Sequence, residues 1–246
     1  MYGTDLEPHV YDLVPQVADH VHWDTGEKWS DIRFGVSDKT SAAGGGHAHI
    51  GLMIYQGTNW PAAYRGGLFT LNLHGRRINH DLLAAKGAGY TATHGADMAF
   101  IDDPFYRGMD LVQGPDGGVY IADWSDTGEC HDHDGVHRTS GRIYKLVHGT
   151  PRSPRRVNLM ALEGTALRGN LLVEDQWWSR AAVREWQRRA LAGQDLSADA
   201  AWLRDRAAKA ADPLHRLRAI WALAAIDTPA AGTLDEGFTV GLLDDA

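Results

Sequence analysis

The segment DWSDTGECHDHDGVHRTSGRIYKL, residues 123–146, concentrates side chains that bind metals and move protons. It holds the only cysteine of the chain and three of its thirteen histidines, interleaved with acidic residues. Thiolate and imidazole groups are the ligands that zinc and copper prefer in proteins. We therefore predict a metal site in this segment, formed by Asp126, Glu129, Cys130, His131 and His133.

Two other interpretations of the same segment stay open. Calcium prefers hard oxygen donors, and the segment supplies them at Asp123, Asp126, Glu129, Asp132 and Asp134. The spacing is not that of a known zinc finger, so the segment also suits a solvated loop between two strands. In that loop, Asp and Thr side chains would bond to backbone amides.

Histidines and arginines gather at two further places. GGGHAHIG, residues 44–51, puts His47 and His49 on one face of a strand entrance, where three glycines allow a sharp bend or a close approach to a ligand. They either line a pocket or support the neighbouring loops through hydrogen bonds. In HGRRINH, residues 74–80, Arg76 and Arg77 either bind an anion or form a charged hairpin tip, and we favour the tip.

Short strands separated by glycine turns are predicted between about residues 46 and 148. The segments with strand character are HIGLMIYQG, GGLFTLNLHGRRINHDLL, GYTATHGADMAFI, GMDLVQGPDGGVYIADW and GRIYKLVHG. GPDGG predicts a tight turn, because Pro115 fixes φ and Asp-Gly favours reversal. The strand–turn–strand unit recurs about every 40 to 50 residues, a period typical of propeller blades. Residues 1–45 are expected to add an outer strand and a loop.

Helices are predicted after a proline-punctuated linker at residues 151–170. DPLHRLRAIWALAAI has Asp212 as a helix N-cap and Pro213 at the first helical position. Antiparallel helix pairs of this size indicate an α-solenoid of the HEAT type over residues 171–246. Two helices carry apolar faces, and their tryptophans Trp178, Trp186 and Trp221 are predicted to lie in the core. These faces are Trp178, Ala182, Val183, Trp186 and Ala190 in one helix and Leu214, Leu217, Ile220, Trp221 and Ala224 in the other.

Composition excludes several classes of protein. The chain has 246 residues and a formal net charge of −8, so nucleic-acid binding is not expected. A single cysteine excludes an internal disulfide framework, a four-cysteine zinc site and a CxxCH haem motif. MYGTDLEPHVYDLVPQ lacks the basic start and apolar run of a signal peptide, and no stretch is apolar enough to span a membrane. Nucleotide-binding and hydrolase motifs are absent from the sequence.

Two long segments resemble a known family. GGGHAHIGLMIYQGTNWPAAYRGGLFTLNLHGRRINHDLL and DPFYRGMDLVQGPDGGVYIADWSDTGECHDHDGVHRTSGRIYKLVHG are similar to the membrane-bound dehydrogenase proteins of planctomycetes and verrucomicrobia. Those proteins combine a six-bladed propeller, similar to the glucose/sorbosone dehydrogenases, with HEAT repeats and often a cytochrome c module. The resemblance implies the last blades of a six-bladed-type β-propeller at residues 1–150, followed by truncated HEAT-like helices.

The resemblance also implies that the chain is a fragment. A six-bladed propeller needs about 250 residues at this period, and the chain supplies about a third of them. The early blades, which carry the catalytic histidine base in quinoprotein sugar dehydrogenases, have no counterpart here. We therefore expect either a truncated reading frame or a second chain that supplies the missing blades, and we assign no catalytic residue.

The cofactors that the resemblance implies are the quinone PQQ and calcium, and the location it implies is periplasmic or secreted. Late-blade arginines of the sugar dehydrogenases contact the carboxylates of the quinone. Here Arg138 and Arg142 take that place, with His47 and His49 in the pocket wall. Two tryptophans, Trp60 and Trp124, either line a sugar-binding face or pack between blades.

Two functions are therefore predicted. The first is part of a quinoprotein-like dehydrogenase that oxidises a sugar or alcohol and passes electrons to a cytochrome c. The second is a non-enzymatic propeller–solenoid scaffold that binds a glycan or a protein partner.

Overall fold

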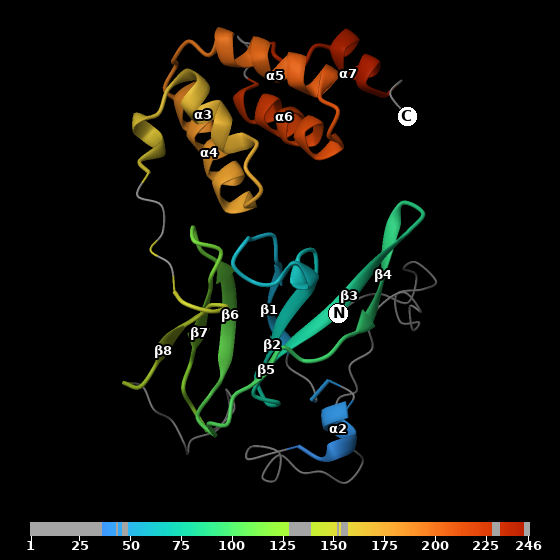
Figure 1. Cartoon of the computed structure of the whole chain (residues 1–246), viewed down its shortest axis with the longest axis vertical. Helices are drawn as coiled ribbons and strands as arrows, with labels where there is room; N and C mark the ends of the chain where they lie inside the picture. Colours follow the sequence, from blue (N-terminus) through green and yellow to red (C-terminus); the bar gives the residue numbers. More distant parts are fainter. Residues whose placement is uncertain are drawn as a thin grey trace, which may run out of the picture. The chain divides into compact units, whose positions relative to one another are not determined.

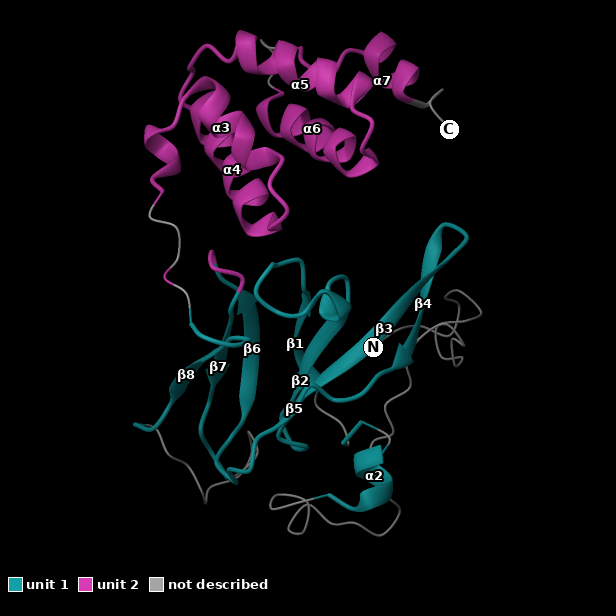
Figure 2. Ribbon diagram, in the orientation of Figure 1, with its two compact units in different colours: residues 1–114, 118–151 teal, residues 115–117, 152–246 magenta. Residues whose placement is uncertain are grey.

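The structure is a computed structural model that describes residues 36–42, 44–45, 49–127, 139–151, 153, 157–227 and 232–243. The chain divides into two compact units (Figure 2). Unit 1 comprises residues 1–114 and 118–151, and unit 2 comprises residues 115–117 and 152–246. The described part of unit 1 is built mainly of antiparallel strands and that of unit 2 of helices, so the predicted change from β to α structure is confirmed at this level. Among the described residues, no helix is long and apolar enough to cross a membrane.

The first sheet of unit 1 is an antiparallel meander (Figure 1). Its strands follow one another in space in chain order, and the short β5 returns to pair with the start of β3. The strands are β1 (His49–Ile54), β2 (Leu68–Asn72), β3 (Arg77–Lys86), β4 (Gly89–His94) and β5 (Ala99–Phe100). A short helix, α2 (Asp38–Ala42), precedes the sheet, and a 3-10 turn at Ala62–Tyr64 lies between β1 and β2.

The second sheet of unit 1 has three antiparallel strands. They are β6 (Gly108–Gln113), β7 (Val119–Asp123) and β8 (Arg142–Leu146). The predicted tight turn joins β6 to β7. Its Gly117 has a φ of 78°, which a residue with a side chain rarely adopts. The Gly114 amide donates to the Gly118 carbonyl at 2.7 Å and closes the hairpin.

The two sheets share one hydrophobic core. Alternation along β2 directs Phe69 and Leu71 into it, and β6 and β7 contribute Leu111 and Ile121. Neither sheet closes on itself in the described part of the chain. The structure therefore shows two packed, open antiparallel sheets, while the six-bladed propeller stays a prediction.

The described part of unit 2 consists mainly of helices. They are α3 (Gly164–Leu171), α4 (Gln176–Leu191), α5 (Ser197–Lys209), α6 (Pro213–Ile226) and α7 (Glu236–Leu243), preceded by a 3-10 turn at Leu159–Ala161. Helix α3 lies largely within the range where the sequence predicts a linker, and its Leu167 and Leu171 are fully buried in the helical core. The Asp212 cap is confirmed, because its carboxylate accepts from the Leu214 amide at 2.9 Å.

The predicted apolar face of α6 is wrong in its orientation. Leu214, Leu217 and Trp221 are 37%, 41% and 50% exposed. The helix instead buries Ala219, Ala222, Leu223 and Ile226. Small alanine side chains permit a close approach between helices. The packing gained in this way outweighs the burial that the larger apolar residues on the other face would give. In α4, by contrast, Trp178 and Trp186 are buried as predicted.

His80 of β3 is a titratable group inside the core of unit 1. Its ring stacks on Phe69, with ring centroids 4.6 Å apart, and lies edge-on to Tyr64. A Cβ atom on Gly67 would lie 2.5 Å from the His80 Nε2 atom, so a larger residue there would collide with the ring. Burial lowers the pKa of His80, the nearby Asp81 opposes this shift and the nearby His94 adds to it.

We predict that unit 1 loses stability as the pH falls from about 7.5 to about 5.5. Folding favours neutral His80, so stability is fully present above the unfolded histidine pKa of about 6.5 and falls as the pH drops below it. Urea unfolding followed across this range should show a smaller pH dependence in His80→Phe than in the wild type. The exposed His148→Gln variant should keep the wild-type dependence, and equal slopes in all three proteins would contradict the prediction.

Candidate functional site

Polar side chains collect at one end of the two sheets of unit 1. In the first sheet His49 lies opposite Asn72, and Arg77 lies opposite both Asn72 and Phe100. In the second sheet Asp123 lies opposite both Gly108 and Arg142. Residues 101–107 run directly from the end of β5 to the start of β6, so these strand ends adjoin. We call this region the polar end.

A buried arginine organises the first sheet at the polar end. Arg77 is 2% exposed and donates to the Asp97 carboxylate at 2.8 Å and to the backbone carbonyls of Ser41 and Gly75 at 3.1 Å. Asn79 donates to the same carboxylate group at 2.7 Å. Because a buried charge must be paired and hydrogen-bonded, this network fixes the turn between β2 and β3.

His49 takes part in a neighbouring network. The Asn72 side-chain oxygen accepts from the Gly75 amide at 2.7 Å, and this bond orients the Asn72 amide group. The Asn72 nitrogen therefore donates, both to the Gly44 carbonyl at 2.9 Å and to His49 Nε2 at 3.3 Å. His49 Nε2 accepts this bond, so the ring supports the neighbouring turn through a hydrogen bond, which is the second of the two roles predicted for it.

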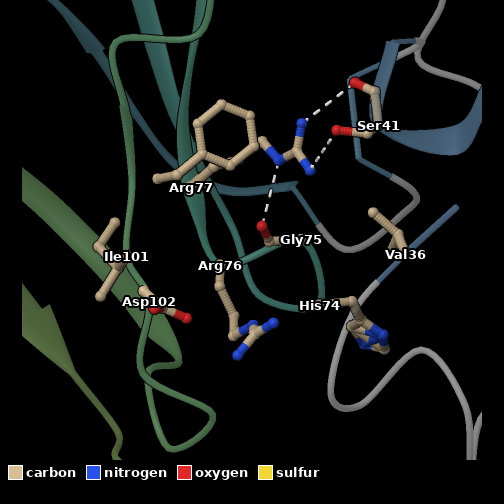
Figure 3. Close-up of a pocket in the computed structure, with 9 residues that line it drawn as sticks. Val36, Ser41, His74, Gly75, Arg76, Arg77, Ile101 and Asp102 are labelled. Atoms are coloured by element: carbon tan, nitrogen blue, oxygen red, sulfur yellow. Dashed lines mark hydrogen bonds between the residues drawn. The ribbon is translucent and has the colours of Figure 1, made fainter. Parts of the chain in front are cut away.

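A cavity of about 340 Å³ opens beside this turn (Figure 3). Its lining combines apolar, cationic and acidic side chains, and consists of Val36, Ser41, His74, Gly75, Arg76, Arg77, Phe100, Ile101 and Asp102. Arg76 adopts a φ of 49°, in the left-handed region that non-glycine residues seldom occupy. Such strain costs on the order of 1 kcal/mol and gathers at binding sites.

Two aspartates hold Arg142 at the start of β8. Arg142 Nη1 donates to Asp103 at 2.5 Å, and its Nε donates to Asp123 at 2.6 Å. Burial opposes ionisation of Asp103. The hydrogen bonds from Arg142 and the Phe105 amide, together with the charges of Arg142 and Arg76, outweigh it and lower the pKa of Asp103. The arginine predicted to contact a quinone is thus engaged by two carboxylates.

The residues after β7 form a firmly held loop. The Trp124 amide donates to the Arg107 carbonyl and the Asp126 amide to the Phe105 carbonyl, both at 2.8 Å. Ser125 has a φ of 57°. The Trp124 indole is 62% exposed, and its Nε1 donates to the Asp126 carboxylate at 3.3 Å.

The structure brings together four of the predicted site residues and separates a fifth. His49, Trp124, Asp126 and Arg142 all lie at the polar end. Trp60 lies in the core instead, where it is 3% exposed and stacks on Tyr55 with ring centroids 4.5 Å apart. Of the two roles predicted for Trp60, the structure therefore favours packing over a sugar-binding face. The other predicted residues, His47, Glu129, Cys130, His131, His133 and Arg138, lie outside the described residues.

Sequence reasoning missed the groups contributed by residues 97–107. Phe100 and Asp102 line the cavity, Asp97 holds its Arg77, and Asp103 holds Arg142 at the start of β8. The signal was present in FIDDPFYRG, residues 100–108, where an aromatic residue and two aspartates follow a strand and precede a proline. Strand ends and the loops after them are common places for binding groups.

The described residues of the polar end do not by themselves supply the excess positive charge that the carboxylates of the implied quinone need, and the implied calcium ion would add to it. A ligand with several carboxylates needs arginines that carry excess positive charge. The described carboxylates are Asp97, Asp102, Asp103, Asp123 and Asp126, and they exceed the arginines Arg76, Arg77, Arg107 and Arg142 in number. Within the described ranges, no three His, Cys, Asp or Glu side chains are grouped to hold a metal. The predicted metal site stays a prediction, since all but one of its residues lie outside those ranges.

Comparison with known proteins places the chain in a family. The sequence model of DUF7133, a domain of unknown function, matches residues 12–150, which is more than half of the chain. The chain belongs to the DUF7133 family. The matched range contains both sheets and the whole polar end. No curated protein matches the DUF7133 chain.

One solved structure is similar to part of the DUF7133 chain. It is an oxidoreductase from Thermus thermophilus that has been assigned as a glucose dehydrogenase. The two share 19% identity with a TM-score of 0.30, over 42% of this chain. The match spans 26% of the Thermus chain.

We predict that the Asp123→Asn variant destabilises unit 1 by about 2 kcal/mol, because it weakens the hydrogen bonds of a buried carboxylate whose partner Arg142 is 33% exposed. The Asp123 carboxylate accepts from the amides of Arg107 and Ser125 as well as from Arg142, and all three bonds weaken in the variant. Urea unfolding measures the change. Asp205→Asn, which removes an exposed pair with Lys209, is the control and should leave stability unchanged. Equal effects of the two substitutions would contradict this account.

Proposed function

We propose that the DUF7133 domain of this chain binds a sugar or a related polyhydroxylated molecule at the polar end, as the substrate-binding part of a dehydrogenase-like protein. The cavity beside the β2–β3 turn carries this proposal. It combines an exposed aromatic ring, an arginine and a carboxylate within about 340 Å³. Ligand sites are typically concave, with a few polar groups placed among apolar ones.

Phe100 provides the apolar surface for a sugar. The Arg77 guanidinium lies over its ring, 4.2 Å from the centroid, and Arg77 itself is fixed by Asp97. The ring is held in this way and yet stays 63% exposed. The C–H faces of a sugar ring can stack on such a surface, because they are apolar and carry a slight positive charge toward the negative aromatic face.

Arg76 and Asp102 provide complementary polar groups in the same cavity (Figure 3). A guanidinium group only donates hydrogen bonds and a carboxylate only accepts them, whereas a sugar hydroxyl does both. Neighbouring hydroxyls of one sugar can therefore accept from Arg76 and donate to Asp102. Since the two side chains carry opposite charges, the pair favours a neutral ligand over a polyanion.

Oxidation of such a ligand needs groups beyond this cavity. A hydroxyl loses its proton to a base, and its carbon loses a hydride to a quinone or another hydride acceptor, which leaves a carbonyl. We propose that the base and the hydride acceptor come from outside the described residues, from another part of the protein or from a partner chain. A cytochrome c would then take the electrons, as the family resemblance implies.

A second function is glycan binding without catalysis, within a propeller–solenoid scaffold. The observation that favours it is the poor fit of the described polar end to a polycarboxylate quinone. The two functions share the sugar cavity and differ in turnover. Bleaching of a reducible dye by the protein with PQQ, calcium and glucose would favour the dehydrogenase, because glycan binding alone reduces no dye.

We predict that Phe100→Ala lowers the affinity for glucose or galactose at least tenfold, as measured by titration calorimetry. The reason is the loss of the stacking surface, while Arg77 keeps its bonds to Asp97 and the neighbouring backbone.

Phe238→Ala is the matched control, because Phe238 of unit 2 lies under Arg204 at 4.1 Å in the same geometry. It should leave sugar binding unchanged. A panel of neutral monosaccharides and polyols that shows no binding to the wild-type protein would refute the proposed function.

A further inference from the structure

We propose that the ligand of the polar end is an oligosaccharide, whose second or later sugar unit stacks on Trp124 outside the cavity. This inference rests on the proposed function and specifies its substrate class. The indole is one of the largest apolar groups that unit 1 exposes, at 62% of its surface. A single exposed apolar residue needs no explanation by itself, so the case depends on how this one is held.

The loop that carries Trp124 is fixed on both sides. Its backbone is tied to Arg107 and Phe105, and the Ser125 amide donates to Asp123 at 2.9 Å. Ser125 also occupies the left-handed region, which surrounding structure must enforce. The indole Nε1 donates to Asp126 at 3.3 Å, and this bond favours one orientation of the ring. An exposed aromatic ring with a fixed orientation loses little conformational entropy when a ligand stacks on it.

Trp124 is linked to the cavity by a short series of contacts. Asp102 lines the cavity, and its neighbour Asp103 accepts from Arg142. Arg142 in turn donates to Asp123, which directly precedes Trp124. The cavity wall and the loop that carries Trp124 are thus connected by ion pairs and by neighbouring residues in the chain. The proposed oligosaccharide would extend from the cavity along these residues toward the indole.

The size of the cavity supports a ligand that extends beyond it. Its volume of about 340 Å³ lies near the lower end of the range for small-molecule sites, which is about 300 to 1,000 Å³. It therefore suits a single sugar unit with its water molecules. Phe100 serves that unit, and a second aromatic surface outside the cavity has a use only if the ligand is longer.

The experiment compares glucose with a series of gluco-oligosaccharides of two to four units, in both α-1,4 and β-1,4 linkage. The wild-type protein should bind one of the longer series about tenfold more tightly than it binds glucose. Trp124→Ala should remove this gain and leave the affinity for glucose unchanged. Phe100→Ala should weaken binding to every member of the series.

Two further variants keep the result interpretable. Trp221→Ala removes another half-exposed tryptophan, on α6 of unit 2, and should have no effect on binding. Trp124→Tyr keeps an aromatic surface and should restore most of the gain if Trp124→Ala proves unstable. Equal wild-type affinities for glucose and the longer sugars would overturn this inference and leave the proposed function standing. Equal losses for glucose and the longer sugars in Trp124→Ala would also overturn it, while failure of every sugar to bind would reject both proposals.

Discussion

The buried carboxylate of Asp123 is the contact on which the polar end depends. Its side chain is fully inaccessible, and it accepts from the amides of Arg107 and Ser125 and from the Arg142 side chain. These three donors come from the start of β6, the loop after β7 and the start of β8. One carboxylate therefore holds three strand ends in register, and it orients the arginine and the tryptophan loop that adjoin it. A buried charge is retained only when its hydrogen bonds are complete, which explains the number of donors.

The balance of charge at the polar end decides which ligands suit it. Each arginine that the structure buries there has a carboxylate or several carbonyl groups as partners, as Arg77 and Arg107 show. Neutralised arginines position loops but offer little excess positive charge to an anion. What stays available is a mixture of donors, acceptors and aromatic surface around a modest cavity. Such a surface matches hydroxyl-rich neutral molecules better than a polycarboxylate cofactor.

The two units illustrate different limits of pattern reading. In β2, Phe69 and Leu71 alternate with Leu68, Thr70 and Asn72 and are fully buried, since a strand has two faces and one of them must be buried. In α6 two apolar faces compete. The larger residues form the more conspicuous stripe, but the alanine face packs more closely on its neighbours. Hydrophobic periodicity alone does not rank two such faces, because the choice depends on the shape of the partner helices.

The sequence by itself determined the tight turn at GPDGG, the cap at Asp212 and the change from β to α structure. All of these depend on interactions within a few residues, where propensity and turn chemistry act. It also identified His49, Trp124, Asp126 and Arg142 as residues of interest. Only the tertiary structure decided that these four gather at one end and that Trp60 is buried. It alone showed that Asp102 and Asp103 join them, because pairing between distant strands and the neutralisation of one charge by another are set by the folded chain.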